Sequence, residues 1–157
     1  MNSSIKNMIL TPLILLIGIA SIGQELTVEI AHNIKYGNTE KLEIYTSPEL
    51  INVCLGTKKS KKYNYLTMSI KLKSMKSLKY FIEQGADIEG VCADKTPLMY
   101  AAKYGQLEMV KYLIEKGADL NASYRRNTAY DYAKKFNHPE IKKYLKEHKL
   151  QHKNRYN

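Results

Sequence analysis

Apolar and polar positions between residues 96 and 121 follow the spacing of two short amphipathic helices. One face of the first helix carries small apolar side chains and one face of the second carries larger ones: Leu98, Ala101 and Ala102, then Leu107, Val110, Leu113 and Ile114. Thr96 before Pro97 suits a helix start, because the threonine oxygen can accept from a free backbone N–H and proline needs no donor there. Gly105 and Gly117 can adopt the left-handed conformation that ends each helix. The segment therefore predicts two antiparallel helices followed by a turn.

The same unit recurs along the chain with a period of 32 residues. Gly85-Ala86-Asp87 lies one period before Gly117-Ala118-Asp119, and Thr128 lies one period after Thr96. The apolar face repeats as well: Leu78, Tyr80, Phe81 and Ile82 are in register with Val110, Tyr112, Leu113 and Ile114, and Tyr144 and Leu145 follow in the next unit. A single helical hairpin cannot bury both of its faces, so these units are expected to stack on one another.

The Thr-Pro-Leu start and the later Gly-Ala-Asp make the chain resemble the ankyrin-repeat family over residues 64–148, most closely in the middle repeat. The resemblance implies an all-α solenoid of stacked helix-turn-helix hairpins, with about three to four repeats including divergent caps. Met99 replaces the histidine that usually follows Thr-Pro-Leu, so that residue's bracing hydrogen bond is absent. The first matched repeat departs further, with Asn64-Tyr65 in place of Thr-Pro and Lys73 in place of the glycine between the helices.

Both ends of the repeat array have patterns of their own. Three regions are predicted after the N-terminal segment: a divergent N-terminal capping repeat with a basic insertion at 24–60, the repeats at 61–148, and a polar tail at 149–157. Helical spacing in the capping repeat involves Leu26, Ile30, Ile34, Leu42 and Ile44. In the last repeat Lys142 and Lys146 take the registers of Val110 and Ile114. An outer face that meets water needs such polarity, so this repeat is expected to cap the C-terminal end.

Residues 1–23 have the pattern of a secretory signal. Lys6 precedes a mostly apolar run of about 15 residues, which is shorter than the roughly 20 that span a bilayer as a helix. Small residues place cleavage between Gly23 and Gln24 or between Ala20 and Ser21. We therefore expect an exported protein, periplasmic or secreted, of the bacterial ankyrin-repeat type, with membrane contact only through the signal before cleavage. The alternative is an uncleaved membrane anchor.

Two cysteines, Cys54 and Cys92, both precede predicted helical hairpins. An oxidising compartment would permit a disulfide between them. The two readings are a disulfide and a pair of free, partly buried thiols, and the Cα separation that decides between them cannot be read from the sequence.

No motif for catalysis is evident. The chain contains no glycine-rich phosphate loop, nucleophile elbow or Cys-x-x-Cys pair. His148 and His152 could share a helix face, but no third metal ligand is near them in sequence. The sequence therefore predicts a protein that is not an enzyme and has no cofactor or metal.

Candidate binding residues come from register, because partners of ankyrin proteins usually meet the loop tips and the exposed face of the first helix. The repeating positions and loop tips give Met68, Lys71, Lys95, Tyr100, Lys103, Tyr104, Arg125, Arg126, Tyr132, Lys135 and Phe136. A lysine ladder thus runs beside an aromatic stripe. Leu72 also falls in this register, and a looser alignment adds Lys35 and Tyr36. Lysines at such positions are often only solvated, and aromatic rings there can instead pack between hairpins.

Composition adds a basic surface to this picture. The chain has 25 basic and 15 acidic residues, a net charge of +10, and 13 tyrosines. Our first hypothesis is a monomeric module that binds an unidentified protein through its concave face and loop tips, with no nucleic acid involved. The alternative is an electrostatic binder of an acidic polymer or an anionic membrane surface.

Overall fold

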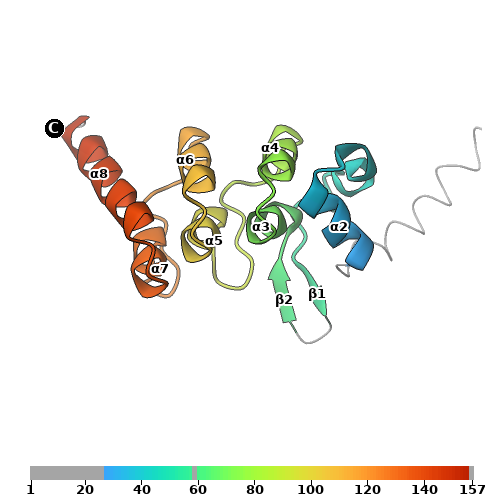
Figure 1. Cartoon of the computed structure of the whole chain (residues 1–157), viewed down its shortest axis with the longest axis horizontal. Helices are drawn as coiled ribbons and strands as arrows, with labels where there is room; N and C mark the ends of the chain where they lie inside the picture. Colours follow the sequence, from blue (N-terminus) through green and yellow to red (C-terminus); the bar gives the residue numbers. More distant parts are fainter. Residues whose placement is uncertain (1–26, 58–59, 156–157) are drawn as a thin grey trace, which may run out of the picture.

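The computed structural model describes residues 27–57 and 60–155, so the predicted signal segment lies outside the described residues. Seven α-helices lie in this part of the chain: α2 (Val28–Tyr36), α3 (Tyr65–Lys71), α4 (Met75–Glu83), α5 (Pro97–Lys103), α6 (Leu107–Glu115), α7 (Ala129–Lys135) and α8 (Pro139–Arg155). Helices α3, α5 and α7 pack side by side, and α4, α6 and α8 form a second row beyond them (Figure 1). The structure is therefore a helical solenoid, as the 32-residue period predicts.

The core lies between the two rows of helices. The larger apolar side chains of the predicted faces fill it, and Leu78, Phe81, Leu98, Val110 and Leu113 are each at most 2% exposed. In the last repeat Ile141 and Leu145 are buried on one side of α8, whereas Lys142 and Lys146 are exposed on the other. This arrangement agrees with a polar outer surface on a terminal repeat.

The first helix of each repeat begins at a residue whose side chain caps it: Asn64, Thr96 or Thr128. Thr96 accepts from the Met99 N–H at 3.3 Å. Asn64 takes the same position in the first repeat and accepts from the Thr67 N–H at 2.8 Å, while the Thr67 hydroxyl oxygen accepts from the Asn64 N–H at 2.9 Å. This reciprocal capping box allows α3 to begin at Tyr65 without the usual Thr-Pro pair.

The turn between the paired helices needs one left-handed residue in each repeat. Gly105 has φ 69°, and Lys73 and Asn137 have φ 61° and 57° at the equivalent positions. A second constraint acts on Gly105, because a Cβ atom there would lie 2.6 Å from Cε1 of His138. That imidazole donates through Nε2 to the carbonyl of Lys103 at 3.1 Å, which ties the end of α5 to the next repeat.

Three fingers project on the side of the first helices. The first is an antiparallel hairpin of β1 (Leu55–Thr57) and β2 (Ser60–Tyr63), the only sheet in the described residues. The second and third are tight turns at residues 92–95 and 124–127, each with two residues at positive φ, the geometry of a type I′ turn. The sequence predicted only a basic insertion before the repeats, so the hairpin is a local addition to a chain that is otherwise helical, as expected.

The segment before the first finger packs against α3. Ile30 and Ile34 on α2 are buried, as their spacing predicts. Two short 3-10 helices follow, Thr39–Lys41 and Glu43–Tyr45. The expected apolar position Ile44 is 52% exposed, whereas Tyr45 is buried, with its ring centroid 5.3 Å from that of Tyr65. The tighter helical geometry shifts the buried face by one residue.

The last helix takes in most of the predicted polar tail. Helix α8 continues through Arg155, well past the expected start of a polar tail at residue 149.

Hydrogen bonds between loops join neighbouring repeats. The Asn52 side chain accepts from the Asp87 N–H at 2.9 Å, and the Glu89 carboxylate accepts from the Asp119 N–H at 2.8 Å.

Candidate interaction surface

Aromatic rings and lysines form a continuous row across the first finger and the first helices. We call it the tyrosine–lysine strip, and its members are Tyr63, Lys71, Lys95, Lys103, Tyr104, Tyr132, Lys135 and Phe136. The strip crosses three consecutive repeats because α3, α5 and α7 stack side by side. Its residues belong to the face that the register predicts for binding.

Tyr63 joins the first finger to the second repeat. Its hydroxyl lies 2.7 Å from the hydroxyl of Tyr104, which is hydrogen-bond distance. Its ring centroid is 5.3 Å from that of Tyr100, and the Tyr100 and Tyr104 rings stack at 6.2 Å. Burial raises the pKa of the Tyr104 hydroxyl, and the hydrogen bond with Tyr63 raises it further. The three rings therefore form one packed aromatic group.

The lysines of the strip lie over these rings. Lys71 Nζ is 4.5 Å from the Tyr63 ring centroid. Lys103 Nζ is 5.3 Å from the centroid of Tyr104 and 5.4 Å from that of Phe136, so it bridges the second and third repeats. Such cation–π contacts hold the ammonium groups over the rings while leaving donors available.

The second finger places Lys95 in a more enclosed position. Its Nζ donates to the Ala93 carbonyl at 2.6 Å and lies 5.6 Å and 5.8 Å from the ring centroids of Tyr100 and Tyr132. Burial lowers the pKa of Lys95, and the positive charge of Lys103 lowers it further. Lys95 and Lys103 are thus close enough to repel one another.

The exposure of the predicted residues divides them into two groups. Phe136 is 40% exposed, Lys71, Lys135, Arg125 and Arg126 are exposed, and Lys95, Lys103, Tyr104, Tyr132 and Leu72 are half-buried. Met68 and Tyr100 are only 3% and 2% exposed, so the expectation that both lie on an open surface is corrected. The Tyr100 hydroxyl is turned inward and donates to the Cys92 carbonyl at 2.9 Å. Tyr100 therefore supports the strip from beneath.

The N-terminal end of this face contains two predicted residues, Lys35 and Tyr36, and one that was not predicted, Tyr63. Lys35 and Tyr36 pair with each other on α2, with Nζ 5.2 Å from the ring centroid. Tyr63 was missed because it follows a basic segment with no apolar alternation. Only its position directly before the N-cap residue Asn64 offered a signal.

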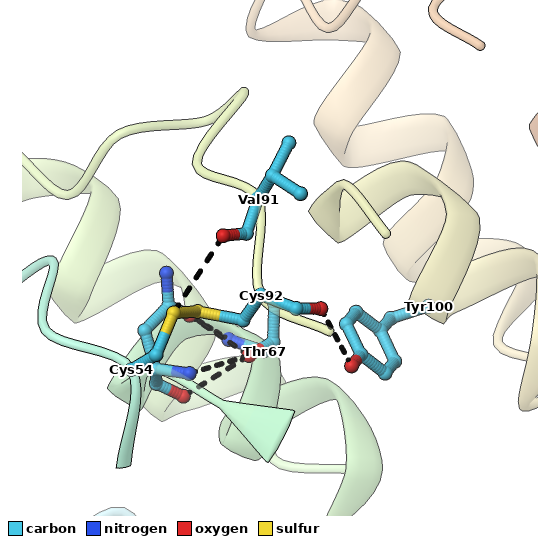
Figure 2. Close-up of a disulfide and its surroundings, with 6 residues drawn as sticks. Cys54, Thr67, Val91, Cys92 and Tyr100 are labelled. Carbon is cyan, nitrogen blue, oxygen red and sulfur yellow. Dashed lines mark hydrogen bonds between the residues drawn. A yellow bond between two sulfur atoms is a disulfide. The ribbon is translucent and has the colours of Figure 1, made fainter. Parts of the chain in front are cut away.

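A disulfide joins Cys54 and Cys92, whose Cα atoms are 5.8 Å apart (Figure 2). It links the start of the first finger to the second finger, 38 residues later in the sequence. Figure 2 shows the Tyr100 side chain reaching the carbonyl of Cys92 from the far side of this bridge. The bridge thus fixes the backbone that carries both Lys95 and the acceptor of the Tyr100 hydroxyl.

An ion pair joins the tips of the second and third fingers. Arg125 Nη2 lies 2.8 Å from Asp94 Oδ2, and the side chain of Arg125 remains largely exposed. Arg126 occupies the next position of the same turn and is exposed. The finger tips therefore present guanidinium groups beside the strip.

A metal site and a membrane-spanning helix are two further features to consider in residues 27–57 and 60–155. No group of three or more His, Cys, Asp and Glu side chains there is placed to hold a metal ion. Within the same residues, none of the helices combines the length and the apolar character that crossing a bilayer requires.

Comparison with known protein families gives the class of the chain. A family model described as ankyrin repeats, in three copies, matches residues 30–124 and 66–157. Together with the stacked helical hairpins, this match shows that the chain belongs to the ankyrin-repeat family. No curated protein matches the chain. Ankyrin repeats are generally non-enzymatic modules for protein–protein interaction.

Proposed function

We propose that this protein is a non-enzymatic binding module that holds a protein partner on the face formed by the first helices and the fingers. The observation that carries the proposal is the tyrosine–lysine strip, which spans three repeats on one side of the solenoid. Aromatic side chains offer a large contact area at a low cost in conformational entropy, and they are frequent among the residues that dominate binding.

The anchors of such an interface are the rings that remain accessible. Phe136 is 40% exposed and stacks on Tyr132 with ring centroids 6.4 Å apart. Because the rings already pack on one another, little side-chain freedom would be lost on binding. The lysines over the rings would mainly steer the approach of the partner.

We further propose that the protein acts outside the cytoplasm. Two independent features support export. One is the predicted signal at residues 1–23, and the other is the disulfide between Cys54 and Cys92, since disulfides persist mainly in oxidising compartments. Measuring the intact mass of the protein from its source cells tests the first feature. A chain that begins at Gln24 or Ser21 is expected, and a full-length product in the membrane fraction would contradict removal of the signal.

Crosslinking in intact source cells, followed by mass spectrometry, tests the binding proposal. Phe136→Ala and Tyr132→Ala should each weaken capture of the partner by about 1–3 kcal/mol, as loss of an aromatic anchor does. The matched control is Tyr112→Ala, which removes a half-buried ring from α6 in the other row. Circular dichroism must show that each variant folds. Equal capture by all three variants would place the binding face elsewhere.

An acidic polymer or an anionic membrane surface remains the second candidate partner. The lysines of the strip favour it, because they gather on one face. Binding that depends mainly on such charges loses roughly tenfold or more in affinity for each few-fold rise in salt. A shallow dependence on salt, together with sensitivity to Phe136→Ala, favours the protein partner.

A further inference from the structure

The first helices and the second and third fingers are more basic than the part of the other row formed by α4 and α6. The first helices α3, α5 and α7, together with the tips of the second and third fingers, carry seven basic and two acidic side chains: Lys71, Lys95, Lys103, Arg125, Arg126, Lys134 and Lys135, and Asp94 and Asp131. Helices α4 and α6, with the segments that follow each of them up to residues 91 and 123, carry four basic and six acidic side chains. The first side therefore has a net charge of +5, and the side formed by α4, α6 and their following segments has a net charge of −2. Helix α8 of the second row is itself basic, with six basic and two acidic residues, so the contrast between the two faces holds along α4 and α6 and not at the C-terminal end.

Both acidic side chains on the basic side are already engaged. Asp94 pairs with Arg125, and the Asp131 carboxylate accepts from the N–H and the hydroxyl of Thr128 at 2.8 Å and 2.7 Å. Among the side chains that the structure describes, the ion pairs are Lys111–Glu108 and Arg125–Asp94, so the lysines of the strip have no carboxylate within 4.0 Å. Their positive charges are therefore available to an external anion.

The ion pair between Asp94 and Arg125 is an example of a carboxylate bound by a basic side chain on this face. The Asp94 carboxylate lies at the tip of one finger and meets the guanidinium of the next finger at 2.8 Å. The neighbouring Lys95 feels the repulsion of Lys103, which contributes to its lowered pKa. A carboxylate brought between these lysines would relieve that repulsion.

The spacing of the lysines determines how far apart the negative charges of a partner must lie to contact all of them. Lys71, Lys103 and Lys135 recur at every 32nd residue, one at the C-terminal end of each first helix. Packed helices lie about 8–10 Å apart, so successive lysines are separated by about that distance. A peptide in the extended polyproline II conformation rises about 3.1 Å per residue with three residues per turn, so every third side chain returns to the same face about 9 Å further on.

We propose that the partner presents an extended acidic segment with a carboxylate at every third residue, which lies along the strip with its carboxylates on Lys71, Lys103 and Lys135. The intervening residues contact the rings of Tyr104, Tyr132 and Phe136. This inference rests on the proposed function and specifies its partner by charge and spacing. Proline-rich acidic sequence fits the geometry, because proline prefers this extended conformation and packs well on aromatic rings.

The test uses the full chain with its disulfide formed and a fluorescently labelled peptide of four Glu-Pro-Ala triplets, with binding followed by anisotropy. The comparison peptide has the same composition with its four glutamates adjacent. The spaced peptide should bind about fivefold or more tightly than the comparison peptide. The double variant Lys71→Gln/Lys103→Gln should weaken binding of the spaced peptide about tenfold, because each exposed charge pair contributes modestly.

A matched control comes from the other row. Lys79→Gln/Lys116→Gln removes the same charge, and both of those lysines also lie over a ring, that of Tyr112, at 5.4 Å. This control should change binding of the spaced peptide by less than about twofold, because these lysines lie outside the strip. Equal losses from the two double variants would overturn the proposal, because net charge alone would then explain binding.

The remaining outcomes separate this inference from the proposed function. Equal binding of the two peptides, or no binding of either, would overturn the proposal that the partner presents an extended acidic segment. The proposed function would still stand if Phe136→Ala weakened capture of the cellular partner. Vesicles with a fraction of anionic lipid provide the other comparison: binding to them that needs Lys71 and Lys103, without binding to the spaced peptide, would assign the strip to a membrane surface instead.

Discussion

The first repeat, α3–α4, and the second, α5–α6, build the same helical hairpin from different residues. The second begins with Thr96-Pro97 and turns at Gly105, whereas the first begins with Asn64-Tyr65 and turns at Lys73. Asn64 and Thr96 both accept from a backbone N–H three residues later. What is retained between the repeats is therefore a hydrogen-bond acceptor at the helix start and a left-handed residue at the turn.

The two repeats differ most in how they are joined to their surroundings. Tyr65 takes the position of Pro97 and is fully buried between Tyr45 and Phe81, with ring centroids 5.3 Å and 5.7 Å away. The first repeat also follows the hairpin finger, which the disulfide links to the second finger. The first repeat thus relies on aromatic packing and a covalent link where the second follows the family pattern.

The largest expected effect comes from removing the central apolar side chain of each repeat. Phe81→Ala should destabilise the protein by about 3–5 kcal/mol and Leu113→Ala by about 2–5 kcal/mol, because both side chains are fully buried and each truncation leaves a cavity. Urea unfolding followed by circular dichroism measures both. Lys103→Ala is the control on the surface: the side chain is half-buried and lies outside the apolar core, so the change should alter stability by no more than about 0.5 kcal/mol. A loss from Lys103→Ala as large as that from Leu113→Ala would contradict the assignment of faces.

Removing the disulfide should have the next largest effect, and it should act mainly on the first repeat and the second finger. Cys54→Ser/Cys92→Ser should lower the free energy of unfolding by about 2–4 kcal/mol, since the bridge closes a long loop in the unfolded chain. Hydrogen exchange should show faster opening around residues 54–63 and 91–95. An unchanged denaturation midpoint would mean that the bridge adds no stability.

The turn residues offer a reciprocal pair of substitutions. Gly105→Ala should destabilise by about 1–3 kcal/mol, because alanine is strained at φ 69° and its Cβ would meet the ring of His138. Lys73→Gly should stabilise by up to about 1 kcal/mol, because glycine removes the strain of a left-handed lysine but gains freedom in the unfolded chain. Thermal unfolding of both variants measures the difference. A loss of stability in Lys73→Gly would show that the lysine side chain has a packing role.

The smallest effect is expected at Tyr65. Its hydroxyl is buried and has no hydrogen-bond partner among the residues that the structure describes, and burial raises its pKa. Tyr65→Phe should therefore raise stability by about 1 kcal/mol, since an unsatisfied buried polar group is costly. Chemical denaturation compares the variant with the parent chain. A decrease in stability would show that the hydroxyl finds a partner in solution.

Most of the solenoid could be predicted from the sequence, because helical spacing and the 32-residue period depend on local properties of residues such as Leu113 and Gly105. The hairpin finger could not, since its second strand includes Lys61 and Lys62 and has no alternation of apolar and polar residues. Register placed Lys103 and Phe136 on the proposed face. Register also placed Tyr100 on this face, which was wrong, since Tyr100 is buried against the ring of Tyr63 on the neighbouring finger. Such burial depends on tertiary contacts that the sequence does not reveal.

The cystine has a mechanical consequence. A protein held by its two ends lengthens as its repeats unravel, and each released residue adds at most about 3.3–3.6 Å of contour. The chain between Cys54 and Cys92 forms a closed loop whose ends stay 5.8 Å apart, so force along the backbone passes through the sulfur atoms and bypasses the first repeat. With a sequence separation of 38, an oxidised molecule would extend by roughly 130 Å less than a reduced one. Under tension, the first repeat and the hairpin finger would be shielded, and only the repeats beyond the cystine would yield their full length.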